Sequence, residues 1–457
     1  MKPYALFLAV ILIISACAPK PKQDLEKLDE YARKQLSVWN RNLTHVIVQD
    51  IFPPPVSSRI YMYANVAAYE ALQPSDSSFL SLAGQLNGLE KVPQPAPDKE
   101  YYLPVSSIIA FATVGKALVF SPDSVDRYEQ QYLEEVKSMG IDKHLLNNSI
   151  AYGRIVGQHI LAWCNDDNYK QTRGMSKHVL SDQLGHWQPT PPDYMPGIEP
   201  HWNKIRTIVL DSANQFVPPP PTAFDTLPTS KFYKEAMEVY QAVGGVDNER
   251  IKTAQYWDCN PNISFTRGHV MFFEQQLSPG GHWIMIANTA TQKANLSPLE
   301  CAETLALTSV ALFDGFIACW DEKYRSDLIR PHTYINKYID KNWEPVLQTP
   351  PFPEHTSGHS VISTAAATLL TAIFGPAFSF TDTAEVPFGR EARSFNSFYE
   401  ASNQAAISRL YGGIHYRPAI EYGVDQGKKV GKYVINNIQT RVGEKWMLEE
   451  ETYASSE

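Results

Sequence analysis

The stretch LSPLECAETLALTSVALFDGFIACWDEKYRSDLI, residues 296–329, decides the fold class. Its apolar residues recur at the spacing of one helix face, and the stretch therefore predicts a single long helix. Ser297 and Pro298 mark its start, because a capping hydroxyl followed by proline suits the first helical turn. Its end is expected near Arg330, since the residue before Pro331 is pushed out of helical geometry. A helix of this length makes an all-helical protein the first expectation.

Most of the chain on either side carries the same helical spacing of apolar residues. The exception extends from about residue 165 to 229, where PTPPDYMPGIEP and FVPPPPTAF hold too many prolines for regular helix or sheet. This stretch is expected to be either a long ordered arm on the surface or a domain boundary. We predict an all-α fold with two four-helix-bundle-like halves and this proline-rich arm. The halves are expected to divide the mature chain into residues 17–240 and 241–445.

The composition is that of a globular protein, with 457 residues of which 44% are hydrophobic and 19% charged. The net charge of −9 leaves no basic excess to neutralise phosphates, so we expect no nucleic-acid partner. Any anion site must come from a local concentration of lysine and arginine. Four cysteines, Cys164, Cys259, Cys301 and Cys319, show no metal-like spacing and are expected to be small buried thiols.

The N-terminus has the layout of an export signal. Lys2 precedes an apolar run, residues 5–14, which is too short to span a bilayer. Cys17 follows small residues as in a bacterial lipoprotein signal, so residues 1–16 are expected to be removed and Cys17 to be lipidated. A plain signal peptide that is cut elsewhere is the alternative. We expect an exported protein that is attached to a bacterial membrane, on its periplasmic or cell-surface side, only through this lipid.

Three short segments carry residues with catalytic chemistry, and the first holds Lys323 and Arg330. They are seven residues apart, which places both on one face of a continuous helix; two solvated charges near a helix end are the alternative. The second segment, PFPEHTSGH, holds Ser357 and Gly358 where a helix is expected to begin, followed by His359. Open N–H groups at a helix start bind anions, and a histidine there suits acid–base work. An N-cap followed by a merely packed histidine is the alternative.

The third segment, SRLYGGIH, ends with His415 and holds Arg409 six residues earlier. Six residues do not share one face of an ideal helix, but Gly412 and Gly413 allow the chain to turn between them. An ordinary helix end is the alternative. Together the three segments supply lysine, arginine, serine, an open backbone N–H group and histidine, a set that suits a tetrahedral oxyanion.

The ordered pattern K-x6-R-P, SGH and S-R-x5-H resembles the phosphatidic acid phosphatase/vanadium haloperoxidase superfamily. ALFDGFIACWDEKYRSDLIRP, TPPFP, HWQPTPP and SSRIYMYANVAAYEAL are similar to its vanadium-dependent haloperoxidase branch, in particular to exported bacterial enzymes that oxidise iodide or bromide. The resemblance covers most of the mature chain and is close from about residue 250 to 430. It implies an all-helical fold around two four-helix bundles and a vanadate cofactor.

The resemblance also implies roles for the residues of the three segments. His415 would be the ligand of vanadium, His359 the acid–base residue, and Lys323 would polarise bound peroxide. Hydrogen peroxide and a halide, iodide or bromide, would be the substrates, and hypohalous acid the product. Vanadate would be held by Lys323, Arg330, Ser357, Gly358, Arg409 and His415.

Three further side chains correspond to the halide side of the family's site: Trp320, Phe352 and His355. Trp320 lies one helical turn before Lys323, and an apolar wall favours a weakly hydrated halide. Ordinary core positions for both aromatics are the alternative. His355 stands where relatives often carry an aromatic, and it is expected to tune the site or to hydrogen-bond the oxyanion.

The family pattern does not assign the acids that orient His415 and His359 in this sequence. Relatives carry an acid four residues after the ligand histidine, where it fixes the imidazole ring. Here Ala419 stands at that place, and Glu421 or a backbone carbonyl is expected to substitute. An acid that orients His359 is expected upstream, and in YWDCNPN the candidates are Asp258 and Asn260.

The same pocket also suits an acid phosphatase, with His415 as the nucleophile of a phospho-histidine intermediate. The missing acid after His415 and the aromatics Trp320 and Phe352 favour the haloperoxidase. A non-catalytic anion-binding lipoprotein is a third interpretation, which the complete set of site residues disfavours. The sequence leaves homo-oligomerisation open.

Overall fold

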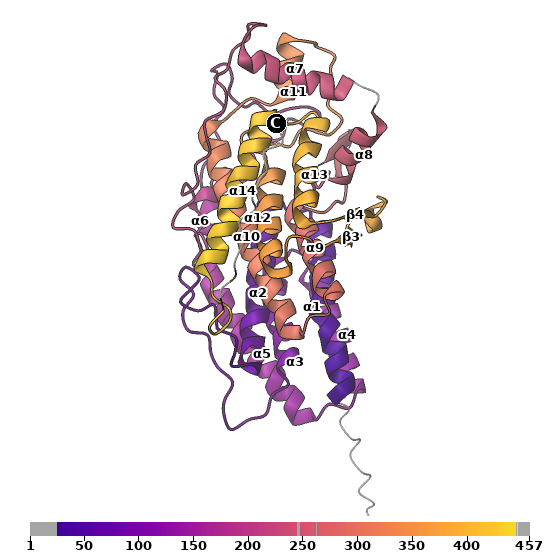
Figure 1. Ribbon diagram of the computed structural model, residues 1–457. Coiled ribbons are helices and arrows are strands. Elements are labelled where there is room, and N and C mark those ends of the chain that lie inside the picture. Colours follow the sequence, from indigo (N-terminus) through magenta and orange to yellow (C-terminus); the bar gives the residue numbers. More distant parts are fainter. Residues whose placement is uncertain (1–24, 245–246, 262, 445, 447–457) are drawn as a thin grey trace, which may run out of the picture.

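The computed structural model describes residues 25–244, 247–261, 263–444 and 446. These residues are mostly helical, which confirms the all-α prediction. In Figure 1 the N-terminal helices, drawn in indigo to magenta, occupy the lower part, and the C-terminal helices, in orange to yellow, the upper part. The described strands form two short antiparallel hairpins, β1 (Ser264–Arg267) with β2 (Val270–Phe273) and β3 (Phe380–Asp382) with β4 (Arg393–Phe395).

The N-terminal group of helices consists of α1 (Leu25–Gln49), α2 (Pro54–Leu72), α3 (Leu103–Leu118), α4 (Pro122–Ser138) and α5 (Lys143–Asn165). Every residue of α2 is buried. Its few charged side chains are paired inside the protein, as Arg59 is with Asp167 at 2.6 Å. Because α2 is apolar on all sides, it packs against both α3 and α5 and forms the centre of this group.

The long predicted helix is α10 (Pro298–Ser326). Ser297 caps it as predicted, in a capping box in which the Glu300 N–H donates to the Ser297 hydroxyl and the Ser297 N–H donates to the Glu300 carboxylate. By length and composition α10 is able to cross a membrane, but its most apolar window is entirely buried inside the protein. It is a core helix, which contacts α2 of the N-terminal group as well as the C-terminal helices.

The C-terminal group consists of α9 (Pro279–Lys293), α12 (Gly358–Phe374), α13 (Phe398–Tyr411) and α14 (Arg417–Asn437), packed with α10. At Gly427 the helix α14 lies so close to α12 that an added Cβ would come within 2.3 Å of the Val361 carbonyl oxygen. The main hydrophobic cluster contains buried side chains of both groups, such as Tyr63 and Phe313, whose rings lie 6.5 Å apart. The division near residue 240 stays a prediction.

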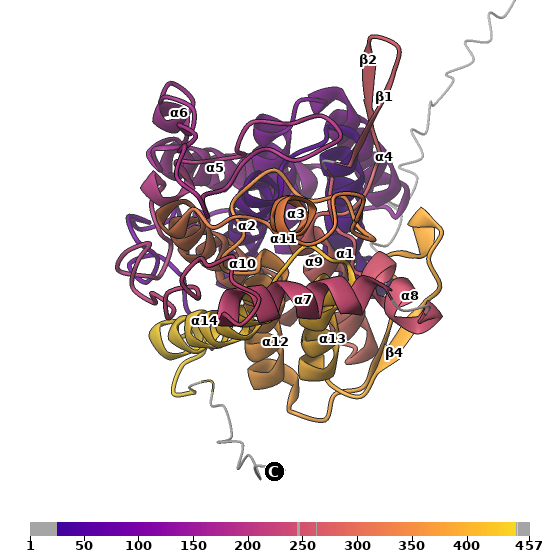
Figure 2. The same ribbon diagram turned by 90° about the horizontal axis from the view of Figure 1, so that it is seen from above.

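Short elements complete the described fold. Seen from above in Figure 2, α7 lies across the C-terminal group, and the β1–β2 hairpin projects away from the helices. The remaining elements are α6 (Tyr169–Thr172), α7 (Lys231–Gly244), α8 (Asn248–Tyr256), α11 (Pro331–Tyr338) and the 3-10 turns η1 (Gln73–Ser75), η2 (Trp202–Lys204) and η3 (Val386–Phe388).

The end of α10 differs from the prediction. The helix stops at Ser326, because Asp327 adopts a left-handed conformation with φ of 45°. The Asp327 carboxylate bonds to the rings of His178 and His186, at 3.1 and 2.9 Å, and this contact with the arm holds the turn. Arg330 is therefore not on α10: it is the residue that precedes α11. The argument that seven residues place Lys323 and Arg330 on one helix face is wrong.

The proline-rich stretch is an ordered arm that lies along α10. The Asp314 carboxylate, buried on α10, accepts hydrogen bonds from the backbone N–H groups of residues 208–210 at 2.7 to 3.0 Å. Farther along, the Trp320 indole N–H donates to the Ile198 carbonyl at 3.1 Å. These contacts confirm the arm rather than the domain boundary. The four cysteines after residue 24 are free and buried, as expected, whereas Cys17 lies outside the described residues.

Candidate active site

The second and third segments singled out in the sequence line one small cavity of about 30 Å³ between the N-terminal and C-terminal helices, and Lys323 and Arg330 of the first segment lie behind its wall, each 5.1 Å from the centre of the Phe352 ring. A space of this size holds only two or three water molecules. Apolar and aromatic side chains make most of its wall, and two histidines and one arginine are its main polar groups. The lining residues are Pro54, Cys259, Asn260, Pro279, Phe316, Trp320, Pro350, Phe352, Gly358, His359, Arg409, Ile414 and His415.

Lys323 is fully buried in the last turn of α10. Its ammonium donates to the carbonyl oxygens of Pro353, Glu354 and Thr356, at 3.1, 3.1 and 2.5 Å, and so fixes the loop before α12. Burial lowers its pKa to about 8. The ammonium also lies 5.1 Å from the centre of the Phe352 ring, which joins it to the apolar wall.

The two arginines are buried as completely as the lysine. Arg330 donates from Nε to the Phe352 carbonyl and from Nη1 to the Ile414 carbonyl, both at 2.9 Å, while Nη2 has no partner among the described residues. Burial lowers its pKa to about 10. Arg409 donates from Nη2 to the Trp257 carbonyl at 2.7 Å, and burial lowers its pKa too. Both guanidinium groups are therefore held by backbone carbonyls and retain donors for an anion.

Ser357 and Gly358 begin α12 as predicted. The Ser357 hydroxyl accepts from the Ser360 N–H at 3.3 Å, so it does cap the helix. A Cβ added at Gly358 would lie 3.7 Å from the Trp320 ring, at the cavity wall. Glycine thus leaves room for a ligand to approach the helix N-terminus.

His415 is oriented by a residue that sequence reasoning missed. Its Nδ1 lies 2.8 Å from Glu354 Oε1, and Nε2 lies 3.1 Å from Arg330 Nη1. Burial and the neighbouring Arg330 charge hold the pKa of His415 well below 6.5, so the ring is neutral. Nδ1 then carries the proton and donates to the carboxylate, so the Nε2 lone pair accepts from Arg330 Nη1, and a metal at Nε2 would replace this hydrogen bond.

Glu354 therefore takes the place that Glu421 or a carbonyl was expected to fill. Its Oε1 also accepts from the Tyr416 N–H at 2.9 Å, and burial raises its pKa to about 7. Glu421 is largely exposed and lies 4.0 Å from Arg417. Glu354 precedes the SGH triplet by only three residues, so a signal was present: it is the one acid in the PFPEHTSGH segment, which was expected to contribute to the oxyanion site.

His359 has its ring held by a backbone carbonyl rather than by an acid. Its pKa lies well below 6.5 because of burial, and its ring hydrogen-bonds to the Trp257 carbonyl. Nε2 has no partner among the described residues. The proton must therefore sit on Nδ1, which makes Nε2 a proton acceptor at the cavity. Asp258 and Asn260 flank this position: the charge of Asp258 acts on Arg409, and Asn260 lines the cavity.

The three residues expected on the halide side do not lie together. Trp320 and Phe352 line the cavity, with ring centres 4.9 Å apart. His355 is not among the residues that line the cavity. Its Nε2 donates to the Pro219 carbonyl at 3.2 Å, and its ring packs edge-on against Tyr422. The prediction that His355 belongs to the halide pocket is wrong, because its side chain points to the arm.

The groups at the cavity fit a tetrahedral oxyanion such as vanadate. Three buried cations, Lys323, Arg330 and Arg409, outnumber the nearby buried carboxylates of Glu354 and Asp258, and burial has lowered the pKa of each cation. An anion would stabilise their charged forms and accept from Arg330 Nη2, which has no partner among the described residues. The neutral His415 would supply one metal ligand through Nε2.

Comparisons with known proteins indicate the family of the chain. Residues 303–444 match the family model described as the VCPO second helical-bundle domain. The vanadium chloroperoxidase of Curvularia inaequalis is 21% identical over 88% of this chain and 82% of its own. A bacterial vanadium-dependent chloroperoxidase, at 17% identity and a TM-score of 0.64 over 85% of this chain and 96% of its own, shares the fold.

A more similar structure is that of a bacterial vanadium-dependent iodoperoxidase. It is 46% identical, with a TM-score of 0.86, over 90% of this chain and 98% of its own. Identity at this level over nearly the whole of both chains shows more than a shared fold. The protein belongs to the vanadium-dependent haloperoxidases.

Proposed function

We propose that this protein oxidises a halide with hydrogen peroxide to hypohalous acid in a vanadate-dependent reaction, and that iodide is its halide. The observation that carries the proposal is a cavity with an apolar wall that is lined by Arg409 and the acid-oriented His415, with two further buried cations, Lys323 and Arg330, packed behind its wall at Phe352. The 46%-identical bacterial relative, an iodoperoxidase, supports iodide.

Vanadate would be held by buried cations, by the N-terminus of α12 and by His415. Lys323, Arg330 and Arg409 would neutralise the oxyanion, the N-terminus of α12 at Gly358 would donate N–H groups, and His415 Nε2 would bind the metal. When bound, vanadate supplies a Lewis-acid centre that activates peroxide without changing its own oxidation state. Glu354 would keep the His415 ring in the required tautomer throughout.

Proton movement falls to His359. Its Nε2 faces the cavity without a partner, and its pKa, lowered by burial, keeps it neutral and able to accept a proton from entering peroxide. The Trp257 carbonyl keeps Nδ1 protonated, so the same nitrogen both accepts and returns the proton. Lys323 would act as a fixed positive charge beside the peroxide oxygen that the halide attacks.

The apolar wall of the cavity favours a halide over a phosphate ester. Trp320 and Phe352 offer aromatic surface that suits a large, weakly hydrated anion such as iodide. Acid phosphatase activity is therefore not favoured.

The test is reconstitution of the purified chain with orthovanadate. Peroxide-dependent oxidation of iodide and hydrolysis of an aryl phosphate are measured side by side, with and without vanadate. We expect iodide oxidation only with vanadate, loss of it in His415→Ala, and no loss in His144→Ala, an exposed histidine on α5. Phosphatase turnover without iodide oxidation would refute the proposal.

We also propose that the protein is exported and anchored through a lipid on Cys17. The supporting feature is the signal-like sequence of residues 1–16, which lies outside the described residues. Mass spectrometry of the mature N-terminus and detergent partitioning of Cys17→Ala test it, since the variant should leave the membrane fraction. Self-association is tested on the same preparation by light scattering.

A further inference from the structure

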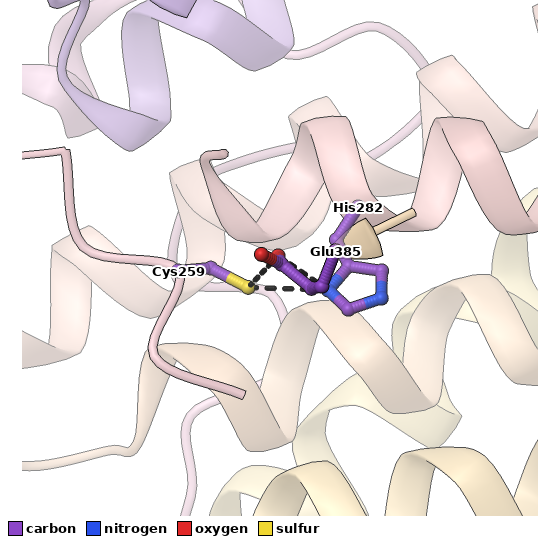
Figure 3. Close-up of side chains that lie close together, drawn as sticks. All are labelled: Cys259, His282 and Glu385. Atoms are coloured by element: carbon purple, nitrogen blue, oxygen red, sulfur yellow. Dashed lines mark hydrogen bonds and ion pairs between the residues drawn. The ribbon is translucent and has the colours of Figure 1, made fainter. Parts of the chain in front are cut away.

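A second buried cluster, Cys259, His282 and Glu385, lies beside the oxyanion cavity, and Figure 3 shows the three side chains converging. They come from three segments: the loop after α8, the first turn of α9, and the residue before η3. Cys259 Sγ lies 3.2 Å from His282 Nδ1 and 3.6 Å from Glu385 Oε1, and these last two atoms are 3.3 Å apart. One sulfur, one nitrogen and one oxygen therefore face a common point inside the protein.

We propose that this cluster binds a zinc ion through Cys259 Sγ, His282 Nδ1 and Glu385 Oε1, with the fourth position open. Zinc bonds are about 2.3 Å to sulfur, about 2.0 Å to nitrogen and about 2.1 Å to oxygen, and tetrahedral geometry then separates neighbouring donor atoms by about 3.4 to 3.6 Å. The separations in the structure, 3.2 to 3.6 Å, fit such a site with little movement. Thiolate and imidazole donors favour zinc over magnesium and calcium, which take oxygen ligands.

The surroundings of His282 are those of a metal-ligating histidine. Its other nitrogen, Nε2, lies 2.6 Å from Asp382 Oδ2, and that carboxylate also accepts from the Tyr256 hydroxyl and the Ala384 N–H, at 2.7 and 2.9 Å. The Trp257 ring stacks on the imidazole, 4.6 Å from centre to centre. A carboxylate on the far nitrogen fixes the ring so that Nδ1 points at the ion.

The donors of this cluster would lose protons when an ion binds. A zinc ion would displace the thiol proton of Cys259 and the Nδ1 proton of His282, and it would compensate the buried carboxylate of Glu385, so that the donors exchange protons for one divalent charge.

The site has an entry path and a mechanical consequence. Cys259 lines the oxyanion cavity, so an ion reaches the sulfur from that side.

Two residues before Cys259, the Trp257 carbonyl accepts hydrogen bonds from Arg409 and from His359. Coordination of Cys259 would thus fix the segment that positions two groups of the catalytic cavity. The ion itself would stand apart from the vanadate, and the inference does not depend on the proposed reaction.

The experiment measures zinc in the purified full-length chain. The protein is loaded with excess zinc, passed through metal-free buffer, and analysed by inductively coupled plasma mass spectrometry. We expect about one zinc ion per wild-type chain. In Glu385→Gln and Cys259→Ser the zinc content should fall by a factor of about ten or more. The matched controls are Glu391→Gln, an exposed glutamate in the same loop, and Cys301→Ser, a buried cysteine outside the cluster, and both should retain the ion.

Cobalt substitution provides a second measurement, and its main result needs only the wild-type chain. Cobalt bound at this cluster should give the charge-transfer absorption of a thiolate ligand, and Glu385→Gln should weaken it. Equal zinc in wild type and Glu385→Gln, or no zinc retained by wild type, overturns the proposal. Absence of the thiolate band overturns it as well, even if Cys259→Ser fails to fold.

Discussion

The oxyanion cavity and the Cys259 cluster share the segment 257–260, yet their histidines respond to burial in opposite ways. His359 and His415 lie among cations, and their pKa values fall well below 6.5. His282 is equally buried but touches Asp382, and its pKa rises well above 6.5. Burial alone favours the neutral ring in all three, so the balance of the surrounding charges decides the outcome. His415 also touches a carboxylate, that of Glu354 at 2.8 Å, but several nearby cations keep its pKa low.

The same contrast determines which ion each cluster suits. The surroundings of the cavity carry an excess of positive charge, and among the described residues Arg330 Nη2 has no hydrogen-bond partner. In the other cluster the donor atoms of Cys259, His282 and Glu385 already face one another, and a carboxylate stands behind the ring. One arrangement stabilises an anion and the other a cation, although a single stretch of chain contributes to both.

The largest expected effect separates the two histidines of the cavity. His359→Ala should lower the turnover number for iodide oxidation by about 10²- to 10⁴-fold, because the proton acceptor at Nε2 is removed. Vanadate binding should change little, since the cations and His415 remain. Vanadate per chain and turnover are measured on the same preparation, with His415→Ala, which should lose vanadate, beside it. Equal loss of vanadate in both variants would contradict the two roles.

The second-largest effect is expected when the carboxylate that pairs with His282 is removed. Asp382→Asn should lower the free energy of unfolding by about 3 kcal/mol, because it leaves a buried charge without its partner. The raised pKa of His282 contributes stability that is complete below about pH 6.5 and is lost as the pH rises through the higher folded value. The difference between wild type and variant should therefore shrink as the pH rises above 6.5.

Urea unfolding at several pH values, with a chelator present, measures this difference. Asp98→Asn, an exposed aspartate, is the control and should leave stability unchanged at every pH. The pKa of Asp382 is lowered, so the stability that its carboxylate contributes is lost only in acid, as the pH falls below 3.8, the ordinary pKa of an aspartate. In that range the difference between wild type and variant should shrink as the pH falls. A difference that is constant from pH 5 to 9 would show that His282 does not carry the charge.

The sequence predicted the parts of the molecule that depend on local patterns. The capping pair before α10, the cap at Ser357 and the turn at Gly413, which has φ of 76°, all follow from residue types at fixed offsets. The family motif likewise brought together Lys323 and Arg330, although the argument from one helix face was wrong. A left-handed Asp327 that ends α10 depends on contacts with the distant arm, which no local pattern reveals.

Contacts between distant segments explain what sequence reasoning missed. Glu354 reaches His415 across 61 positions, and the family's usual offset of four directed attention to Glu421 instead. Spacing also hid the second cluster, since Cys259, His282 and Glu385 are far apart in sequence and follow no metal-binding pattern. His355 was misplaced for a related reason: its partner is a carbonyl of the arm, at Pro219.

The third-largest effect tests whether Glu354, and not Glu421, orients His415. Glu354→Gln should weaken vanadate binding by about 10- to 100-fold, because an amide orients the His415 ring but no longer supports it with a charge. Glu421→Gln, at one of the two substitutes that the sequence left open, should bind vanadate as the wild type does. Titration of the metal-free protein with orthovanadate measures both. If Glu421→Gln is the weaker binder, the structural assignment of Glu354 is wrong.

The smallest effect concerns the apolar wall. Phe352→Leu keeps an apolar side chain but removes the ring that lies 5.1 Å from both the Lys323 ammonium and the Arg330 guanidinium. A contact of this kind contributes about 0.5 to 1 kcal/mol, so the KM for iodide should change by about two- to fivefold. Vanadate affinity should stay within the same small range, because no hydrogen bond to the oxyanion comes from this side chain. An unchanged KM for iodide together with a large loss of vanadate would assign Phe352 to the cofactor rather than to the halide, since the ring's main contribution would then be to keep the two cations in place.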